Sequence, residues 1–161
     1  MTIKVGDKIP SVTLKQLTPE GPKEITTDEL FRGKKVALFA VPGAFTPACS
    51  QRHLPGYVDK AADIRAKGVD EIACDAVNDA FVMGAWGKEQ KTEGKVSMLA
   101  DGSGDFARAL GLELDLTKMG LGIRSKRYSM LVDNGVVKSL NLEQQPGQVD
   151  TSSAETMLKA L

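Results

Sequence analysis

A cysteine placed to react lies between residues 41 and 53, where a run of apolar residues gives way to a loop and then to a helix start. The segment reads Val-Pro-Gly-Ala-Phe-Thr-Pro-Ala-Cys-Ser-Gln-Arg-His. Thr46 is a good helix N-cap, and Pro47 falls at the first helical position, where its missing N–H costs nothing. Cys49 then lies in the first turn, near unpaired backbone N–H groups and the positive end of the helix dipole. Both effects favour the thiolate, which is the nucleophilic form of cysteine.

Cys49 could instead be an inert apolar residue, because free cysteine is among the most buried residue types in proteins. The expected N-cap, the proline and the passage from strand through loop to helix favour a reactive thiol over an inert one. The residues alone therefore indicate a nucleophilic cysteine at the start of a helix.

The elements that must position Cys49 alternate between strands and helices. Apolar or alternating runs predict strands at 11–15 (a sheet edge), 35–41, 72–77, 96–100, 128–132 and 136–138, the last two joined by an Asn134-Gly135 turn. Helical spacing and end signals predict helices at 27–31, from 47 to 67 with a kink at Pro55, from an Asn78 cap to Trp86, at 106–110, and from Ser152 or Ser153 with Glu155 available for a capping box. A turn is expected at 18–22, and a long connection without regular structure at 112–125.

This order of elements predicts a single α/β domain over residues 1–161, with a mixed central sheet and helices on both faces. The order is compatible with a thioredoxin-like domain and leaves other α/β folds open. No internal repeat, low-complexity tract or second domain interrupts the pattern.

Composition excludes several classes of function. The 161 residues suit one domain, and 21 basic residues balance 21 acidic ones, so no net charge recruits nucleic acid or an anionic membrane. No apolar run is long enough to span a bilayer. The two cysteines, Cys49 and Cys74, are too few for a disulfide scaffold and do not form Cys-x-x-Cys. With His53 as the one histidine, we expect no metal site.

The amino terminus, Met-Thr-Ile-Lys-Val-Gly-Asp, lacks the apolar core of a signal peptide and the Arg/Ser-rich helix of a transit peptide. As given, the chain is expected to be cytoplasmic. A removed organellar presequence would leave no trace in it.

The spacing of Pro42, Thr46 and Cys49, Pro-x-x-x-Thr-x-x-Cys, resembles the signature of peroxiredoxins. The longer run Pro-Gly-Ala-Phe-Thr-Pro-x-Cys-Ser-x-x-His-Leu-Pro-Gly resembles the type II (atypical, peroxiredoxin-5-like) branch, and most closely its plant-like and bacterial members. The likeness continues through 77–82, 85–86, 99–102 and 120–128, so it covers nearly the whole chain. It implies a thioredoxin-like fold and a homodimer.

The resemblance also implies a thiol-dependent peroxidase that reduces hydrogen peroxide and organic hydroperoxides, without a cofactor, in antioxidant defence and redox homeostasis. Cys49 would be the peroxidatic nucleophile, which attack on the peroxide leaves as a sulfenic acid. Glutathione with glutaredoxin, or thioredoxin, would then recycle the enzyme.

Three further residues are expected to act with Cys49. Thr46 would donate its hydroxyl to the peroxide, although an N-cap role alone also explains it. Pro42 would shield the pocket from water, although a proline that ends a strand would serve equally. Arg127 matches the family's active-site arginine, whose planar fork of donors suits a charge that moves between two oxygens. Without the resemblance, Arg127 would be taken for a solvated strand residue.

Four other residues are also assigned to the site. Arg124 matches a second basic position of the branch, Gly43 belongs to the pocket loop, and His53 either lines the pocket rim or pairs with backbone. Cys74 resembles the second cysteine of type II members, and it is either a resolving thiol or an unreactive core thiol.

Two other functions remain open at this stage. One is a dithiol oxidoreductase, which the missing Cys-x-x-Cys disfavours. The other is a redox-responsive binding or chaperone-like protein that oxidation of Cys49 switches. Catalytic rather than stoichiometric consumption of peroxide separates the peroxidase from that second protein.

Overall fold

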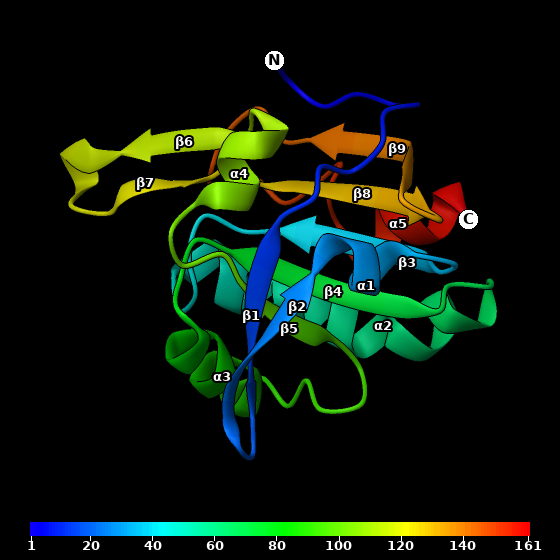
Figure 1. The fold of residues 1–161 in the computed structure, drawn as a ribbon, viewed down its shortest axis with the longest axis horizontal. Helices are drawn as coiled ribbons and strands as arrows, with labels where there is room; N and C mark the ends of the chain where they lie inside the picture. The colour runs from blue at the N-terminus through cyan, green and yellow to red at the C-terminus, as the bar shows by residue number, and fades with distance from the viewer.

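A seven-stranded mixed sheet forms the middle of the protein in the computed structural model, which describes residues 1–161 (Figure 1). Across the sheet the strands follow the order β2-β1-β5-β4-β3-β8-β9. They are β1 (Thr13–Thr18), β2 (Gly21–Thr26), β3 (Lys35–Ala40), β4 (Glu71–Ala76), β5 (Ser97–Ala100), β8 (Tyr128–Asp133) and β9 (Val136–Leu142). The neighbours β3, β4 and β5 are parallel, whereas every other pairing in this sheet is antiparallel.

Helices cover both faces of the sheet, as the order of elements predicts. The first face carries α2 (Leu54–Ala66), α3 (Ala80–Glu89) and α5 (Ala154–Ala160), and the second carries α1 (Thr27–Phe31) and α4 (Asp105–Leu110) (Figure 1). The central strand β3 is buried almost throughout because both of its faces are covered. Its side chains alternate between the two cores, so that Phe39 packs on the first face and Leu38 on the second. None of the helices is long and apolar enough to cross a membrane.

A wide helical turn separates β3 from α2. Residues Cys49–His53 form a π-helical turn, in which the N–H of Leu54 donates to the carbonyl of Cys49. Pro55 follows within the first turn of α2, so the irregularity that the sequence predicts as a kink at Pro55 begins earlier, as a π turn. Such single π turns occur often at functional sites.

The predicted turn at Asn134 and Gly135 is confirmed. Asn134 and Gly135 join β8 to β9, and both have positive φ values, 49° and 81°, as the preferred two-residue hairpin turn requires. Gly111 ends α4 in the left-handed conformation, with φ 72°.

The predictions for two segments were wrong. Residues 112–125 are not irregular: β6 (Glu113–Leu116) and β7 (Gly122–Ser125) form an antiparallel hairpin around a 3₁₀ turn (Thr117–Met119), and this hairpin projects from the body of the molecule (Figure 1). The strand at 11–15 is not an edge, because β1 lies between β2 and β5. The edge is β2, which the sequence did not indicate because its residues are exposed or half-buried and have no apolar alternation.

The start of α3 differs from prediction, and the start of α5 agrees with it in part. Asp79, not Asn78, caps α3, because its carboxylate accepts from the N–H of Val82. The side chain of Asn78 instead accepts from the N–H of Ala44, which ties α3 to the loop before Cys49. Ser153 caps α5 through the N–H of Thr156, and no capping box with Glu155 forms.

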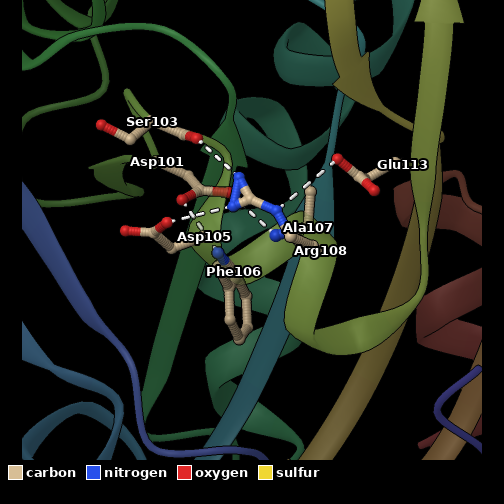
Figure 2. A network of polar contacts seen from close by, with 7 residues as sticks. All are labelled: Asp101, Ser103, Asp105, Phe106, Ala107, Arg108 and Glu113. Atoms are coloured by element: carbon tan, nitrogen blue, oxygen red, sulfur yellow. Dashed lines mark hydrogen bonds and ion pairs between the residues drawn. The ribbon is translucent and has the colours of Figure 1, made fainter. Parts of the chain in front are cut away.

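Two buried carboxyl groups lie at the carboxyl ends of β4 and β5. Figure 2 shows Asp101 at the start of α4, where its two oxygens accept from the N–H groups of Phe106 and Ala107 at 3.0 and 2.9 Å. Asp75 has no such partners, because neither of its buried oxygens makes a hydrogen bond. Burial, and then the nearby charge of Asp101, raise the pKa of Asp75 well above its usual value, which favours the uncharged form of this carboxyl.

Candidate active site

Cys49 lies at the first residue of the π turn, and its side chain is completely buried. The helix opens at Pro47, as predicted, because the ring of proline suits the first helical position. The strand β3 ends at Ala40, so residues 41–46 form the loop that delivers Cys49 to the carboxyl end of the parallel strands. This edge of a parallel sheet is where α/β proteins usually place their ligands.

The hydroxyl of Thr46 faces the sulfur of Cys49. Its Oγ1 lies 2.9 Å from Cys49 Sγ and 2.6 Å from the carbonyl oxygen of Gly43. A hydroxyl has one proton, so it donates to one of these acceptors at a time. Thr46 starts the helix through its own carbonyl, which accepts from the N–H of Ser50, and its side chain accepts from no helix amide. The expected N-cap bond from the Thr46 side chain is therefore absent, and the hydroxyl is placed to bond Cys49 or Gly43.

Arg127 is buried, and each of its three guanidinium nitrogens makes a hydrogen bond. Its Nη2 donates to Cys49 Sγ at 3.1 Å, its Nη1 to His53 Nδ1 at 2.8 Å, and its Nε to the carbonyl of Pro146 at 3.0 Å. Three anchors fix the plane of the guanidinium, which keeps its charge at every working pH. The interpretation of Arg127 as a solvated strand residue is therefore wrong.

His53 is the second partner of Arg127, and it is buried rather than at the pocket rim. Its Nδ1 faces a guanidinium N–H and must accept, so its Nε2 carries the proton and donates to the carbonyl of Ser152 at 3.0 Å. Burial, and then the charge of Arg127, lower the pKa of His53 from 6.5 to about 3. The neutral ring of His53 orients Arg127, and the contact uses the lone pair on Nδ1 of the ring.

Two carbonyl groups that sequence reasoning missed hold this pair. Pro146 accepts from Arg127, and Ser152 accepts from His53 and from the hydroxyl of Tyr57 at 2.8 Å. Both carbonyls belong to the connection between β9 and α5, residues 143–153, which we call the β9–α5 loop. Backbone carbonyls carry no side-chain signal, so no pattern in the sequence could have found them.

Arg124 and Gly43 lie together beside Thr46. A Cβ atom on Gly43 would come within 3.1 Å of Nη1 of Arg124 and 3.2 Å of Cγ2 of Thr46, so a larger residue would require these side chains to shift by a few tenths of an ångström. Arg124 is anchored by Nε to the carbonyl of Leu121 at 2.7 Å and makes no hydrogen bond to Cys49.

An open cleft of about 410 Å³ leads to the site. Pro42, Thr46 and Arg127 line it, together with Arg52 and Pro146. The β6–β7 hairpin and its 3₁₀ turn add an apolar wall that consists of Leu116, Met119 and Leu121. The cleft thus combines donors beside the cysteine with an apolar entrance.

Cys74 lies in the middle of β4, between Phe39 of β3 and Met98 of β5, in the same apolar core as Cys49. Its side chain is completely buried, and both cysteines are free thiols. Burial, and then the neighbouring Asp75 and Cys49, raise the pKa of the Cys74 thiol well above its usual value. The structure therefore favours an unreactive core thiol over a resolving cysteine.

The fold and the site together define a thioredoxin-like redoxin domain with a buried cysteine held between a threonine hydroxyl and an arginine. The family model described as Redoxin matches residues 4–158. Peroxiredoxin-2E, chloroplastic, of Arabidopsis thaliana is 56% identical over 164 residues, which cover 99% of this chain and 70% of that protein. The chain therefore belongs to the peroxiredoxin family: it is a thiol-dependent peroxidase with an antioxidant role. Family membership therefore favours the peroxidase over the dithiol oxidoreductase and the redox-responsive binding protein.

Solved structures support the branch as well as the family. Reduced Prx3 in complex with H₂O₂ from Vibrio vulnificus superposes with a TM-score of 0.94, at 55% identity over 99% of each chain. Peroxiredoxin 5 from Alvinella pompejana superposes with a TM-score of 0.87, at 42% identity over 98% of this chain and 97% of that one. The resemblance to type II, peroxiredoxin-5-like proteins and the thioredoxin-like fold are thus confirmed.

Proposed function

We propose that Cys49 is the peroxidatic nucleophile, that Thr46, Pro42 and Arg127 complete its site, and that hydrogen peroxide and organic hydroperoxides are the substrates. The observation that carries this proposal is the pair of donors on one sulfur, Thr46 Oγ1 at 2.9 Å and Arg127 Nη2 at 3.1 Å. Donors fixed in a buried site stabilise a developing charge without reorganising during the reaction.

In the reaction the Cys49 thiolate attacks one peroxide oxygen. A sulfur–oxygen bond forms, the oxygen–oxygen bond breaks, and the departing oxygen takes a proton to leave as water or an alcohol. Arg127 and the hydroxyl of Thr46 stabilise the negative charge as it moves from sulfur to the departing oxygen. Pro42 lines the cleft and limits access of water to the sulfur.

The apolar wall supports organic hydroperoxides as substrates beside hydrogen peroxide. Leu116, Met119 and Leu121 line a cleft of about 410 Å³, which has room for an alkyl or aryl group outside the reacting oxygens. Burial of that group on the wall would add binding energy that hydrogen peroxide cannot gain.

We propose that an external thiol, glutathione supported by glutaredoxin, reduces the sulfenic acid of Cys49. The thiol displaces water from the sulfenic sulfur to give a mixed disulfide, and a second thiol then releases the Cys49 thiol. The burial of Cys74 in mid-strand supports this route over an internal disulfide, which requires two Cα atoms within about 7 Å and facing side chains. Thioredoxin is the alternative donor.

The test compares the wild type with Cys74→Ser and Cys74→Ala after one equivalent of peroxide, with glutathione present. We expect a glutathione adduct on Cys49 by mass spectrometry, and equal glutaredoxin-supported turnover in all three proteins. A quantitative Cys49–Cys74 disulfide in the wild type, with turnover lost in both variants, would show that Cys74 resolves Cys49.

We further propose that the protein works as a homodimer in a reducing compartment. Phe45, in the loop before Cys49, and Phe81, in α3, are 49% and 65% exposed and offer apolar surface to a second copy. Sedimentation should give a dimer for the wild type and a monomer for Phe81→Glu; a monomeric wild type at micromolar concentration would contradict the proposal.

Two free thiols suit cytoplasm or an organelle stroma, and a relative is named chloroplastic, so localisation of a tagged chain decides the compartment.

A further inference from the structure

A buried glutamate without an ion pair lies behind the active site. Glu143 follows β9 directly, and its side chain is almost completely enclosed. A single oxygen, Oε2, accepts from the N–H of Asp150 at 2.7 Å, the N–H of Ser152 at 2.8 Å and the hydroxyl of Ser152 at 2.5 Å. Three donors converging on one oxygen are the arrangement that holds a carboxylate out of water.

These donors all belong to the β9–α5 loop, whose carbonyl groups anchor the catalytic arginine and its histidine partner. Ser152 gives its N–H and hydroxyl to Glu143 while its carbonyl receives Nε2 of His53. Pro146, between Glu143 and Asp150, gives its carbonyl to Nε of Arg127. The carboxylate thus holds the far end of the loop against the end of β9, and this closure sets the position of both carbonyls.

Glu143 also holds Arg127 through the main chain. Its own N–H donates to the carbonyl of Arg127 at 3.0 Å. One residue therefore fixes the backbone of Arg127 directly and the guanidinium through the loop that its carboxylate closes.

We propose that Glu143 is a positioning residue for peroxide reduction, acting on Arg127 and His53 through the β9–α5 loop. The inference rests on the proposed role of Arg127 at Cys49. Without the carboxylate, the carbonyls of Pro146 and Ser152 shift, and the guanidinium loses the orientation that aims Nη2 at the sulfur. A misplacement of about 1 Å is enough to lower a rate on the order of 100-fold.

The experiment measures the second-order rate constant for oxidation of the protein by hydrogen peroxide in a single turnover, at a temperature well below each variant's Tm. Glu143→Ala should lower this constant by about 10- to 100-fold. Glu143→Gln keeps an amide oxygen that accepts the same N–H groups, so it should restore the constant to within about 3-fold of the wild type. Ser152→Ala, which removes only the hydroxyl donor, provides a milder variant in case Glu143→Ala does not fold, and it should lower the constant several-fold.

Two controls distinguish a positioning role of Glu143 from a contribution to stability alone. Ser153→Ala removes the N-cap of α5 in the same loop, so it should lower Tm while leaving the oxidation rate unchanged. In an Arg127→Met background, Glu143→Ala should slow oxidation by less than about 3-fold, because it acts through the arginine that is already absent.

Two results would overturn the proposal while leaving the site intact. In the first, Glu143→Ala has a lowered Tm but oxidises at the wild-type rate, while Arg127→Met is still slow. If Glu143→Ala does not fold, the same result in Ser152→Ala has the same meaning. The second is an undiminished effect of Glu143→Ala in the Arg127→Met background. A wild-type rate in Arg127→Met itself would instead remove the proposed function of Arg127, from which this inference follows.

Discussion

His53 faces Arg127 with an unprotonated nitrogen, since Nδ1 lies 2.8 Å from Nη1 of the guanidinium. A buried imidazole beside a permanent positive charge stays neutral, and the pKa of His53 is accordingly lowered to about 3. The ring therefore holds the arginine and carries no proton between substrate and solvent. This pairing has consequences for stability as well as for activity.

The pairing predicts a loss of stability in acid. Unfolded His53 takes up a proton below pH 6.5, whereas the folded protein does not until pH falls to about 3. Stability from this group is therefore complete above pH 6.5 and decreases as pH falls toward 3, by about 3 kcal/mol at pH 4.5. Urea unfolding of the wild type and His53→Gln at pH 7 and 4.5 should show a smaller acid loss in the variant. Equal losses in both proteins would mean that His53 is protonated in the fold.

Arg127→Met should slow oxidation by peroxide by about 10²- to 10³-fold, because the moving charge loses a fixed donor. The rate of alkylation of Cys49 should also fall, because its sulfur loses a charged hydrogen-bond donor. Arg127→Lys should recover little, since an ammonium cannot make the three directed contacts of the fork. Arg124→Met is the matched control and should change the hydrogen peroxide rate by less than about 5-fold. Unchanged rates of oxidation and alkylation in Arg127→Met would leave Arg124 as the better candidate for the active-site arginine.

Asp75→Asn should stabilise the protein at neutral and alkaline pH. The raised pKa of Asp75 means that its stability contribution is complete below the ordinary value of 3.8 and is lost as pH rises toward the folded value. The amide has nearly the same shape and does not ionise, so the gain over wild type should be absent near pH 4 and reach roughly 1–3 kcal/mol at pH 8. Asp63→Asn, at an exposed position of α2, serves as the control. A destabilised Asp75→Asn protein at pH 8 would show that the carboxylate has an unseen favourable partner.

Met119→Glu should discriminate between substrates. The side chain of Met119 is 71% exposed on the apolar wall of the cleft, away from the sulfur. A carboxylate there should lower the rate constant for cumene hydroperoxide by roughly 10-fold, through loss of apolar contact, and leave that for hydrogen peroxide nearly unchanged. Stopped-flow oxidation with each peroxide measures both constants. Equal effects on the two substrates would place the wall outside the substrate's path.

The sequence predicted the elements that carry strong local signals. The buried strand before Cys49, the Pro47 helix start and the Asn134-Gly135 turn depend on residues close together in the chain, and all three are present. The hairpin of β6 and β7 lacked such a signal, because it pairs four-residue strands whose residues are largely exposed or half-buried.

The site was only partly predictable for a different reason. Thr46 and Cys49 are three residues apart, so one helix start brings them together. Arg127 depends on the carbonyl of Pro146, and His53 on the carbonyl of Ser152, contacts 19 and 99 residues apart in the chain. Their burial and the neutral state of the ring follow from the β9–α5 loop folding over them, which no local pattern encodes.

The central claim, that Cys49 is the nucleophile that attacks the peroxide, is tested most directly by one equivalent of hydrogen peroxide followed by a sulfenic-acid trap and peptide mass spectrometry. The wild type and Cys74→Ser should carry the trap on Cys49, and Cys49→Ser should carry none and show no peroxidase turnover, because an alcohol provides almost no anion near neutral pH. Substantial turnover by Cys49→Ser in a purified donor system, or a trap found on Cys74 of the wild type, would contradict the account.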